Sequence, residues 1–329
     1  MSTIPTLLID GQNLGYAAFY SSLKSGSALI PSSLCIYEGF FRYLAGAMKR
    51  FGTVRVVFCW DSPVSYRKKL LPTYKAGRRK DKDMDTLIAL DEAHKQFEIL
   101  RNKILPMMGW TTQLYQEGYE ADDHMAKYAN DHLDETIVLV TSDEDLYQCL
   151  RKNRVSIWKP LAKKQAYTAE DLQDEMLCTP LTYKRALALA GCNTDNVPGI
   201  HKVGKATAIK YFNGWIRPEL PMHKKIKEQE KETVRTNRTL VFLPFSHPDF
   251  PALEHPTPQA SDMMLNSKGI YRAYKIFKLN FFTVDDFWTW ACPKLAEEGP
   301  TMSETQTKNV VRNRINKKKK EEEDDVLPF

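Results

Sequence analysis

Short apolar runs, each about as long as a β-strand, recur in the first half of the chain. They occupy residues 6–9, 53–60 and 136–141, and residues 110–115 resemble a fourth strand. The run at 136–141 is continuous rather than alternating, which is typical of a parallel strand covered on both faces. The pattern predicts a mostly parallel sheet buried between helices.

Between these runs, apolar positions recur with the spacing of amphipathic helices. We expect helices over residues 34–51, 87–104 and 121–133, with Gly52 capping the first and Pro106 following the end of the second. The expected buried side chains are Tyr37, Phe41, Leu44, Met48 and Phe51 in the first helix, and Ala121, Met125, Tyr128 and Ala129 in the third. Alternating strands and helices predict an α/β fold.

Beyond residue 150 the pattern becomes mainly helical. A hairpin at 154–167 precedes a helix with a capping pattern at 168–171, and Thr179-Pro180 predicts the start of the next helix. Prolines between 244 and 258 indicate an extended connection before two closing helices. The expected organisation is an α/β domain over residues 1–178, a helical domain over 179–296 and a disordered charged tail over 297–329, with the closing helices at 261–278 and 284–291.

Carboxylates follow three of the predicted strands. Asp10 and Asp61 come directly after the first two, and Asp143 and Asp145 follow the run at 136–141. The carboxyl ends of parallel strands lie at one edge of a sheet, so these side chains are expected to converge. Converging carboxylates repel one another unless a cation lies between them, and this repetition predicts a metal site.

A second acidic group, Glu120-Ala121-Asp122-Asp123, stands at the start of the predicted helix 121–133. For Asp123 alone, capping of the helix is the simpler interpretation. Two acidic loops leaving one helix-strand unit favour a ligand site instead. Oxygen donors without a His/Cys cluster indicate Mg²⁺ or Mn²⁺ rather than Zn²⁺.

Basic residues crowd the stretch that follows Asp61. Between residues 67 and 82 there is one acid, Asp81, against eight cationic residues, which are Arg67, Lys68, Lys69, Lys75, Arg78, Arg79, Lys80 and Lys82. A solvated basic face is the usual meaning of such a run. Its position next to the acidic cluster favours contact with a phosphate-bearing substrate.

Residues 191–208 have the form of a helix-hairpin-helix. Gly199 and Gly204 are expected to allow tight turns, and the helix opening at Lys205 offers free N–H groups to a phosphate. Lys202 adds a cation to the same turn. The alternative is a plain pair of antiparallel helices.

Composition, charge and cysteine content limit the class of protein to which the chain can belong. The chain has 329 residues, 43% of them hydrophobic, and a net charge of +6, with no apolar run long enough to span a membrane. No basic segment or apolar core of a secretory signal stands at the start. Six Cys without regular spacing suggest reduced thiols, and we expect a cytoplasmic monomer with no membrane partner.

The ordered set of motifs resembles the flap endonuclease and 5′→3′ exonuclease family, especially bacteriophage 5′ nucleases and the 5′ nuclease domain of bacterial DNA polymerase I. The similar segments are residues 9–13, 74–78, 120–123, 142–145 and 196–208. The resemblance implies a PIN-like α/β domain with a helical arch, followed by a helical domain with a helix-hairpin-helix. The implied activity is structure-specific hydrolysis of DNA in replication, in the cytoplasm of the host if a phage encodes the protein.

Carried over residue by residue, the resemblance implies a site for two Mg²⁺ ions, which Mn²⁺ can replace. One ion would be held by Asp10, Asp61, Glu120 and Asp122, and the other by Asp143, Asp145 and Asp195 with shared help from Asp122 or Asp123. Lys75 and Arg78 would face the scissile phosphate. Further DNA contacts are expected at Arg67, Lys68, Lys69, Arg79, Lys80, Gly199, Lys202, Gly204 and Lys205, with a K⁺ ion at the helix-hairpin-helix.

One position departs from the family pattern. Where the family has the first Asp of Gly-Asp-x-x-Asp-Asn, this chain has Cys192, and only Asp195 remains. A neutral thiol is a poor ligand for a hard cation, so the second metal is expected to bind weakly or to favour Mn²⁺.

The departure favours one alternative to a 5′ nuclease, a branched-DNA-binding module with impaired cleavage. A PIN-type ribonuclease is a second alternative, which the arch and hairpin motifs oppose. The expected substrates are branched or 5′-flap DNA and RNA-primer/DNA duplexes. The acidic and apolar end of the tail, residues 321–329, resembles the tip of bacterial single-stranded DNA-binding proteins. It is expected to bind a replication partner, with folding back on the basic stretch or an inert tail as alternatives.

Overall fold

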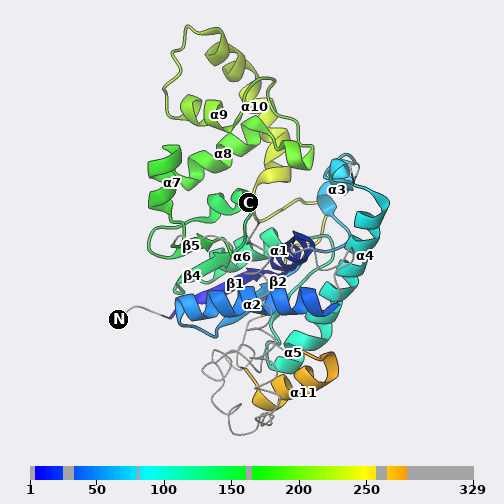
Figure 1. Cartoon of the computed structure of the whole chain (residues 1–329). Helices are drawn as coiled ribbons and strands as arrows, with labels where there is room; N and C mark the ends of the chain where they lie inside the picture. The colour runs from blue at the N-terminus through cyan, green and yellow to red at the C-terminus, as the bar shows by residue number, and fades with distance from the viewer. Residues whose placement is uncertain (1–3, 25–32, 80–81, 161–164, 257–264, 280–329) are drawn as a thin grey trace, which may run out of the picture.

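The computed structural model describes residues 4–24, 33–79, 82–160, 165–256 and 265–279 (Figure 1). Its centre is a five-stranded sheet in the order β3-β2-β1-β4-β5, and every neighbouring pair is parallel. The strands are β1 (Thr6–Asp10), β2 (Val56–Cys59), β3 (Gln113–Leu114), β4 (Ile137–Val140) and β5 (Val155–Trp158). The predicted parallel sheet is confirmed, and β1 lies in its middle.

Successive residues of each strand pack on opposite faces of the sheet. Leu7 and Ile9 of β1 belong to one hydrophobic cluster, whereas Leu8 belongs to the other. In register, Leu8 pairs with Val57 on one side and with Leu139 on the other. The uninterrupted apolar runs therefore reflect burial on both faces.

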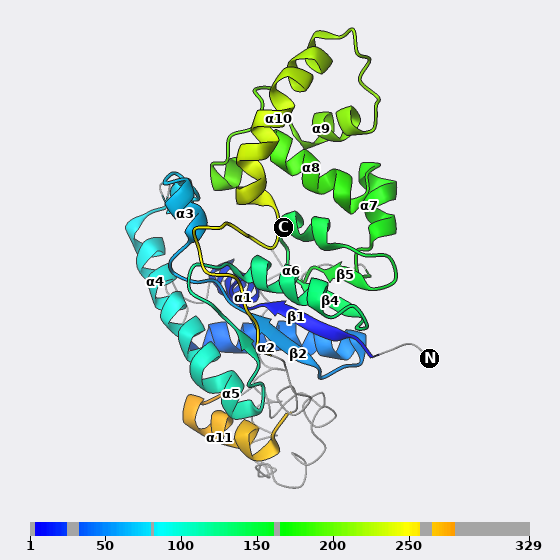
Figure 2. The same cartoon turned by 180° about the vertical axis from the view of Figure 1, so that it is seen from behind.

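Helices α1 (Gly11–Lys24), α2 (Ser33–Phe51) and α4 (Met84–Ile99) cover one face of the sheet, and α6 (Ala121–Asp131) covers the other. Figures 1 and 2 show α2 and α6 on opposite sides of the strands. The side chains expected to be buried in helices α2 and α6 are buried, apart from Phe51, which is half-buried. The predicted apolar faces of these helices are therefore confirmed.

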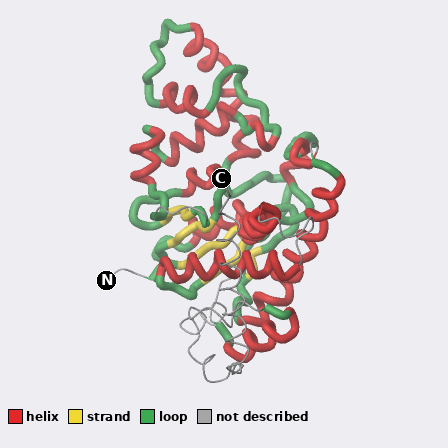
Figure 3. The backbone as a smooth tube through the Cα atoms, in the orientation of Figure 1, coloured by secondary structure: helices red, strands yellow, loops and turns green. Residues whose placement is uncertain are grey.

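A helical part stands above the strands in the view of Figure 3. It consists of α7 (Ala169–Met176), α8 (Pro180–Ala190), α9 (Lys205–Phe212) and α10 (Pro221–Val241). The predicted caps are present, because Thr168 and Asp171 form a capping box and the Thr179 side chain accepts from Thr182 N. Its buried residues, such as Tyr183 and Leu187, join the cluster that contains Leu8.

Some predicted boundaries were wrong. The helix expected to end before Pro106 continues through the π-helical turn η2 (Leu100–Ile104) into α5 (Leu105–Met108). Pro106 stands at the junction of η2 and α5, where the helix passes from the π-helical to the α-helical hydrogen-bond pattern. Gly109, at φ 110°, then ends the helix, which leaves only a short β3.

After α10 the chain returns to the α/β part. Phe250 stacks on Tyr66 with ring centroids 4.4 Å apart, and the Tyr119 hydroxyl donates to the Pro251 carbonyl. Helix α11 (Ser267–Phe277) then packs against α5. The division into three parts stays a prediction, with the qualification that residues 245–253 and helix α11 pack on the α/β part.

The second closing helix, expected at 284–291, and the tail at 297–329 lie outside the described residues. Within the described part of the chain, no helix has the length and apolar character needed to cross a membrane.

Candidate metal centre and nucleic-acid surface

The strand tips bring three carboxylates together from distant parts of the sequence. Asp10 is the last residue of β1, Asp61 lies two residues beyond β2, and Asp143 lies three residues beyond β4. Because β2, β1 and β4 are neighbours in the sheet, their tips lie at the same edge. The charges of Asp61 and Asp143 both act on Asp10.

These carboxylates repel one another in the metal-free protein. Burial and the charges of Asp61 and Asp143 raise the pKa of Asp10 to about 7. Burial and the charges of Asp143 and Asp10 also raise the pKa of Asp122 well above its usual range. For Asp145, burial and the charges of Asp143 and Asp195 raise the pKa to about 6. Such an arrangement of oxygen donors fits hard divalent cations, which would offset the repulsion.

Neutral groups hold these carboxylates in place. Asn13 N donates to Asp10 Oδ1 at 2.9 Å, and the Thr141 hydroxyl donates to Asp10 Oδ2 at 3.2 Å. Ala121 N donates to Asp61 Oδ1 at 2.7 Å. The first turns of α1 and α6 therefore orient the carboxylates of the strand tips.

Glu120, the N-cap residue of α6, has cationic partners. Its Oε2 accepts from Lys75 Nζ at 2.9 Å and from the Tyr74 hydroxyl at 3.1 Å, and Arg67 lies 3.5 Å away. Burial alone would raise the pKa of Glu120, but Lys75 and Arg67 outweigh it and lower the pKa to about 2. The predicted basic stretch thus places one lysine directly at the acidic centre.

Asp123 and Arg67 form an internal ion pair, which corrects two predictions. The Arg67 guanidinium donates to both oxygens of Asp123 at 2.7 Å, and both residues are buried. Phe245 N also donates to Asp123 Oδ1 at 2.7 Å, and Arg67 Nε donates to the Leu240 carbonyl at 2.8 Å. Asp123 is therefore a capping and ion-pairing residue rather than a metal ligand, and Arg67 has no free donor face for DNA.

Asp195 lies in the turn between α8 and α9, close to Asp145. Donor atoms of Asp145, Cys192 and Asp195 all lie within 4.8 Å of one another. The Tyr74 hydroxyl lies 3.2 Å from Asp195 Oδ2 as well as 3.1 Å from Glu120. This group extends the acidic centre toward the helical part, and it includes the cysteine that departs from the family pattern.

The remaining predicted cations of the basic stretch differ in position. Lys68 and Lys69 are exposed, and Lys69 Nζ lies over the Tyr66 ring, 5.1 Å from its centroid. The backbone of Arg78 and Arg79 belongs to the 3-10 helix η1 (Ala76–Arg79). Lys80 lies outside the described residues.

The turn between α8 and α9 presents exposed cations, but the predicted role of its glycines needs correction. Lys202 adopts the left-handed conformation, at φ 66°, whereas Gly199 and Gly204 do not have a positive φ. Gly199 is required by close packing, since a Cβ there would lie 2.0 Å from the Ala190 carbonyl oxygen. Gly204 is the N-cap residue of α9, and Lys205 is exposed at its first position.

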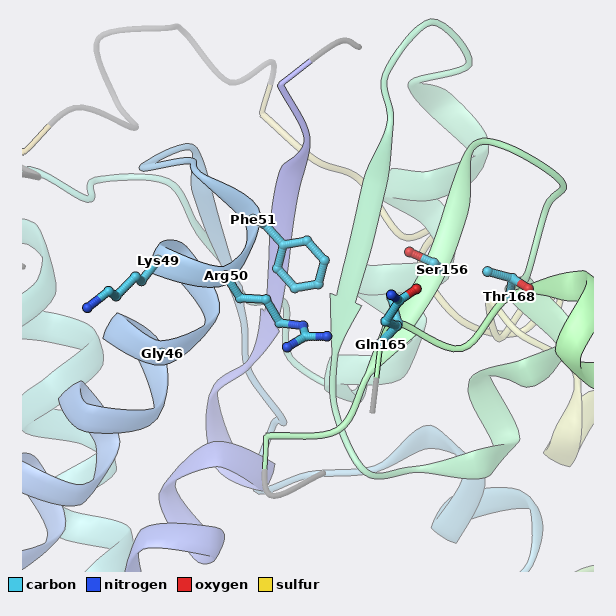
Figure 4. Close-up of a pocket in the computed structure, with 8 residues that line it drawn as sticks. Gly46, Lys49, Arg50, Phe51, Ser156, Gln165 and Thr168 are labelled. Carbon is cyan, nitrogen blue, oxygen red and sulfur yellow. The ribbon is translucent and has the colours of Figure 1, made fainter. Parts of the chain in front are cut away.

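A separate pocket of about 750 Å³ lies between the end of α2 and β5 (Figure 4). Arg50 and Phe51 face Ser156 and Gln165 across it. The strand-tip carboxylates do not line this pocket, so it is distinct from the acidic centre.

The sequence and the fold of this chain are similar to those of known proteins. The family model of the 5′-3′ exonuclease N-terminal, resolvase-like domain matches residues 5–177, which is more than half of the chain. The chain belongs to the 5′-3′ exonuclease family. A 5′-3′ exonuclease of Bacillus subtilis is 30% identical over 218 residues, which cover 64% of this chain and 70% of that relative.

Two further relatives of this exonuclease-family chain are informative. It is 31% identical to thermostable DNA polymerase I of Thermus thermophilus over 213 residues, which are 64% of this chain but only 24% of the polymerase. A structure of the bacteriophage T5 flap endonuclease in complex with DNA and metal ions matches with a TM-score of 0.59 and 16% identity. The match covers 87% of this chain and 99% of the T5 chain. At this identity the likeness concerns the fold.

Sequence reasoning missed some residues of the acidic centre. Tyr74 connects Glu120 with Asp195, and Asn13 and Thr141 position Asp10. Asn13 and Thr141 each lie within three residues of a predicted ligand, so proximity to the strand tips was an available signal. Tyr74 stands beside Lys75 in the segment 74–78, but its hydrogen-bond partners are 46 and 121 residues away, so no local signal indicated which carboxylates it connects.

The raised pKa values predict a pH-dependent response of this protein to metal. The pKa of Asp10 rises from its usual value of 3.8 to about 7 on folding. Its contribution to the stability of the metal-free fold is therefore fully present below about pH 4 and is lost as the pH rises to about 7. Metal binding requires deprotonated ligands, so its stabilising effect should increase over the same range. Saturating Mn²⁺ should therefore raise the Tm more at about pH 8 than at about pH 5.5. A Tm increase that is equal at both pH values would contradict this prediction.

Proposed function

We propose that this chain is a structure-specific 5′ nuclease that uses two Mg²⁺ ions, replaceable by Mn²⁺, to hydrolyse phosphodiester bonds. The observation that best supports this proposal is the set of mutually repelling carboxylates at adjacent strand tips, with Lys75 placed among them. The names of the relatives support the reaction class, because they include a 5′-3′ exonuclease and a flap endonuclease in complex with DNA and metal ions.

The residues suited to hold the two ions form two groups at different places in the acidic centre. Asp10, Asp61, Glu120 and Asp122 form one proposed ligand set, and Asp143, Asp145 and Asp195 form the other. Bound cations would lower the pKa of the nucleophilic water and offset the charge that develops on the phosphate.

The protein's own groups would position the substrate. Lys75 Nζ is partly exposed beside Glu120, where it can hold a phosphate oxygen of the substrate next to the carboxylates. The backbone of Lys75 is tied to the α8–α9 turn, because Lys75 N donates to the Asp195 carbonyl at 3.0 Å. Tyr74 and this bond keep Lys75, Glu120 and Asp195 in a common geometry. Arg78 is proposed as a second cation for the phosphate.

The DNA surface is proposed to comprise two groups of cations. Lys68 and Lys69, with Arg79 and Lys80, would bind the single-stranded end at a helical arch. Lys202, Lys205 and the backbone near Gly199 and Gly204 would bind duplex phosphates as a helix-hairpin-helix, with a K⁺ ion at the turn.

The proposed substrates are 5′-flap or branched DNA and RNA-primer/DNA duplexes in replication. We further propose that the protein acts as a monomer in the cytoplasm, and that residues 321–329 bind a replication partner. Removal of residues 321–329 should abolish capture of that partner without changing flap cleavage. Faster cleavage or tighter DNA binding at low salt would instead indicate that the segment competes with DNA.

A direct test compares a 5′-flap duplex, a linear duplex and an RNA–DNA hybrid, each incubated with and without Mg²⁺ or Mn²⁺. The proposal expects metal-dependent cleavage near the flap junction. Tight flap binding without cleavage in either metal would favour a DNA-binding module, for which Cys192 is the motivating observation. Preferential cleavage of single-stranded RNA would favour a PIN-type ribonuclease.

Two lysine variants should separate catalysis from binding. Lys75→Ala should slow single-turnover cleavage by about 100-fold with a small change in Kd, because the cation acts on charge gained in the transition state. Asparagine is chosen for the Lys202→Asn variant because it tolerates the left-handed backbone at this position. The variant should raise the Kd for DNA and reduce the slope of log Kd against log salt concentration by about 0.9, the value for one lost phosphate contact. Equal effects of both variants on Kd and on the cleavage rate would refute this division of roles.

A further inference from the structure

A thiol lies among the oxygen donors at one side of the acidic centre. Cys192 Sγ and carboxylate oxygens of Asp145 and Asp195 are within 4.8 Å of one another. A transition-metal ion binds thiolate sulfur at about 2.3 Å and carboxylate oxygen at about 2.1 Å, so its donors lie roughly 3 to 4 Å apart. Small side-chain adjustments would therefore allow all three residues to bind one ion.

The backbone holds Cys192 in a closed turn. Cys192 and Val197 exchange two backbone hydrogen bonds of 2.9 Å, and Asp195 N donates to the Cys192 carbonyl at 3.2 Å. Asn196 completes the turn in a left-handed conformation, at φ 56°. The sulfur and the Asp195 carboxylate are thus carried by one hydrogen-bonded turn.

Donor chemistry distinguishes this side of the centre from the other. The carboxylates around Asp10 offer only oxygen, which suits Mg²⁺. A thiolate binds borderline and soft ions more strongly than it binds Mg²⁺, whereas the accompanying carboxylates still accept Mn²⁺. The same turn with an aspartate at position 192 would offer oxygen donors alone.

We propose that Asp145, Cys192 and Asp195 form a mixed carboxylate–thiolate site that selects a borderline transition-metal ion, such as Mn²⁺, Co²⁺ or Zn²⁺, over Mg²⁺. This inference rests on the proposed metal-dependent function and specifies which ion the second position takes. On binding, a metal–sulfur bond replaces the S–H bond and the proton passes to solvent, so no oxidant or reductant is needed.

Cobalt provides a readout that does not depend on cleavage. Titration of the full chain with Co²⁺ should produce a near-ultraviolet thiolate-to-cobalt charge-transfer band that is lost in Cys192→Ser. Cys192→Asp should bind Co²⁺ without that band, and its half-saturating Mg²⁺ concentration, measured from the rise in Tm, should be roughly tenfold lower than that of the unmodified protein. Absence of the band at saturating Co²⁺, or its persistence in Cys192→Ser, would overturn the proposal.

Thiol protection tests the same site without a substitution. Among the described residues, Cys59, Cys149 and Cys178 are buried free cysteines, whereas Cys192 is partly exposed. Peptide mapping after alkylation should show Cys192 protected by Mn²⁺ or Cd²⁺ but not by the same concentration of Mg²⁺. Equal labelling with each ion would place the sulfur outside the coordination sphere and overturn the inference.

These measurements also separate this inference from the proposed function. A charge-transfer band in a protein that cleaves none of the three substrates would support the mixed site and refute the nuclease assignment. Metal-dependent flap cleavage without a cobalt–sulfur band would support the nuclease and refute the mixed site.

Discussion

Asp143→Asn should reduce flap cleavage by at least about 100-fold in saturating Mg²⁺, while the fold stays as stable as before or becomes more stable. The asparagine side chain keeps the oxygen that accepts from Asp145 N at 2.8 Å, so the cap of η3 (Glu144–Cys149) is preserved. The lost negative charge is one that raises the pKa values of Asp10, Asp122 and Asp145. In the absence of metal, removing this repulsion should stabilise the fold by up to about 1 kcal/mol.

The measurements are single-turnover cleavage of a 5′-flap substrate and the Tm in the presence of a chelator. Glu144→Gln is a matched control, because Glu144 is the adjacent acid and is paired with Lys159 at 3.2 Å and Lys205 at 3.7 Å. The control should cleave within a few-fold of the normal rate. Near-normal cleavage by Asp143→Asn would refute a role in metal binding, and a large fall in its Tm would assign the side chain a mainly structural role.

Arg67→Ala should have the opposite profile, with a large loss of stability. The substitution leaves Asp123 as an uncompensated buried charge, which typically costs about 3–5 kcal/mol. For a chain of this size the Tm should fall by roughly 10 °C. Both chemical denaturation and thermal unfolding can measure the change.

Lys68→Ala is the matched control for that experiment, because Lys68 is the adjacent cation and is exposed. Its free energy of unfolding should change by less than about 0.5 kcal/mol, and its affinity for DNA should fall. If Arg67→Ala retained its Tm and only weakened DNA binding, the original prediction of a surface contact would stand and the internal ion pair would be unimportant.

The contrast between Asp122 and Asp123 illustrates what sequence reasoning could resolve. Both stand in the first turn of α6, and local sequence predicts acidic residues there for capping and for metal binding alike. Their environments differ because Asp123 meets Arg67 and Phe245 N, from segments 56 and 122 residues away. The capping interpretation of Asp123 was correct, but no local signal identified its arginine.

The sequence by itself determined the parallel sheet, three of the helices that cover it (α2, α4 and α6) and the acidic residues at the strand tips, whereas α1 was not predicted. These features depend on local periodicity and on the rule that parallel strands end at one edge, both of which can be read from a single chain. Only the tertiary structure decided which charges are available to a ligand. It buried Arg67 against Asp123, joined Tyr74 to Glu120 and Asp195, and placed Cys192 beside Asp145. Burial and ion pairing depend on contacts between segments far apart in the chain, so the same residue types can serve the core or the site.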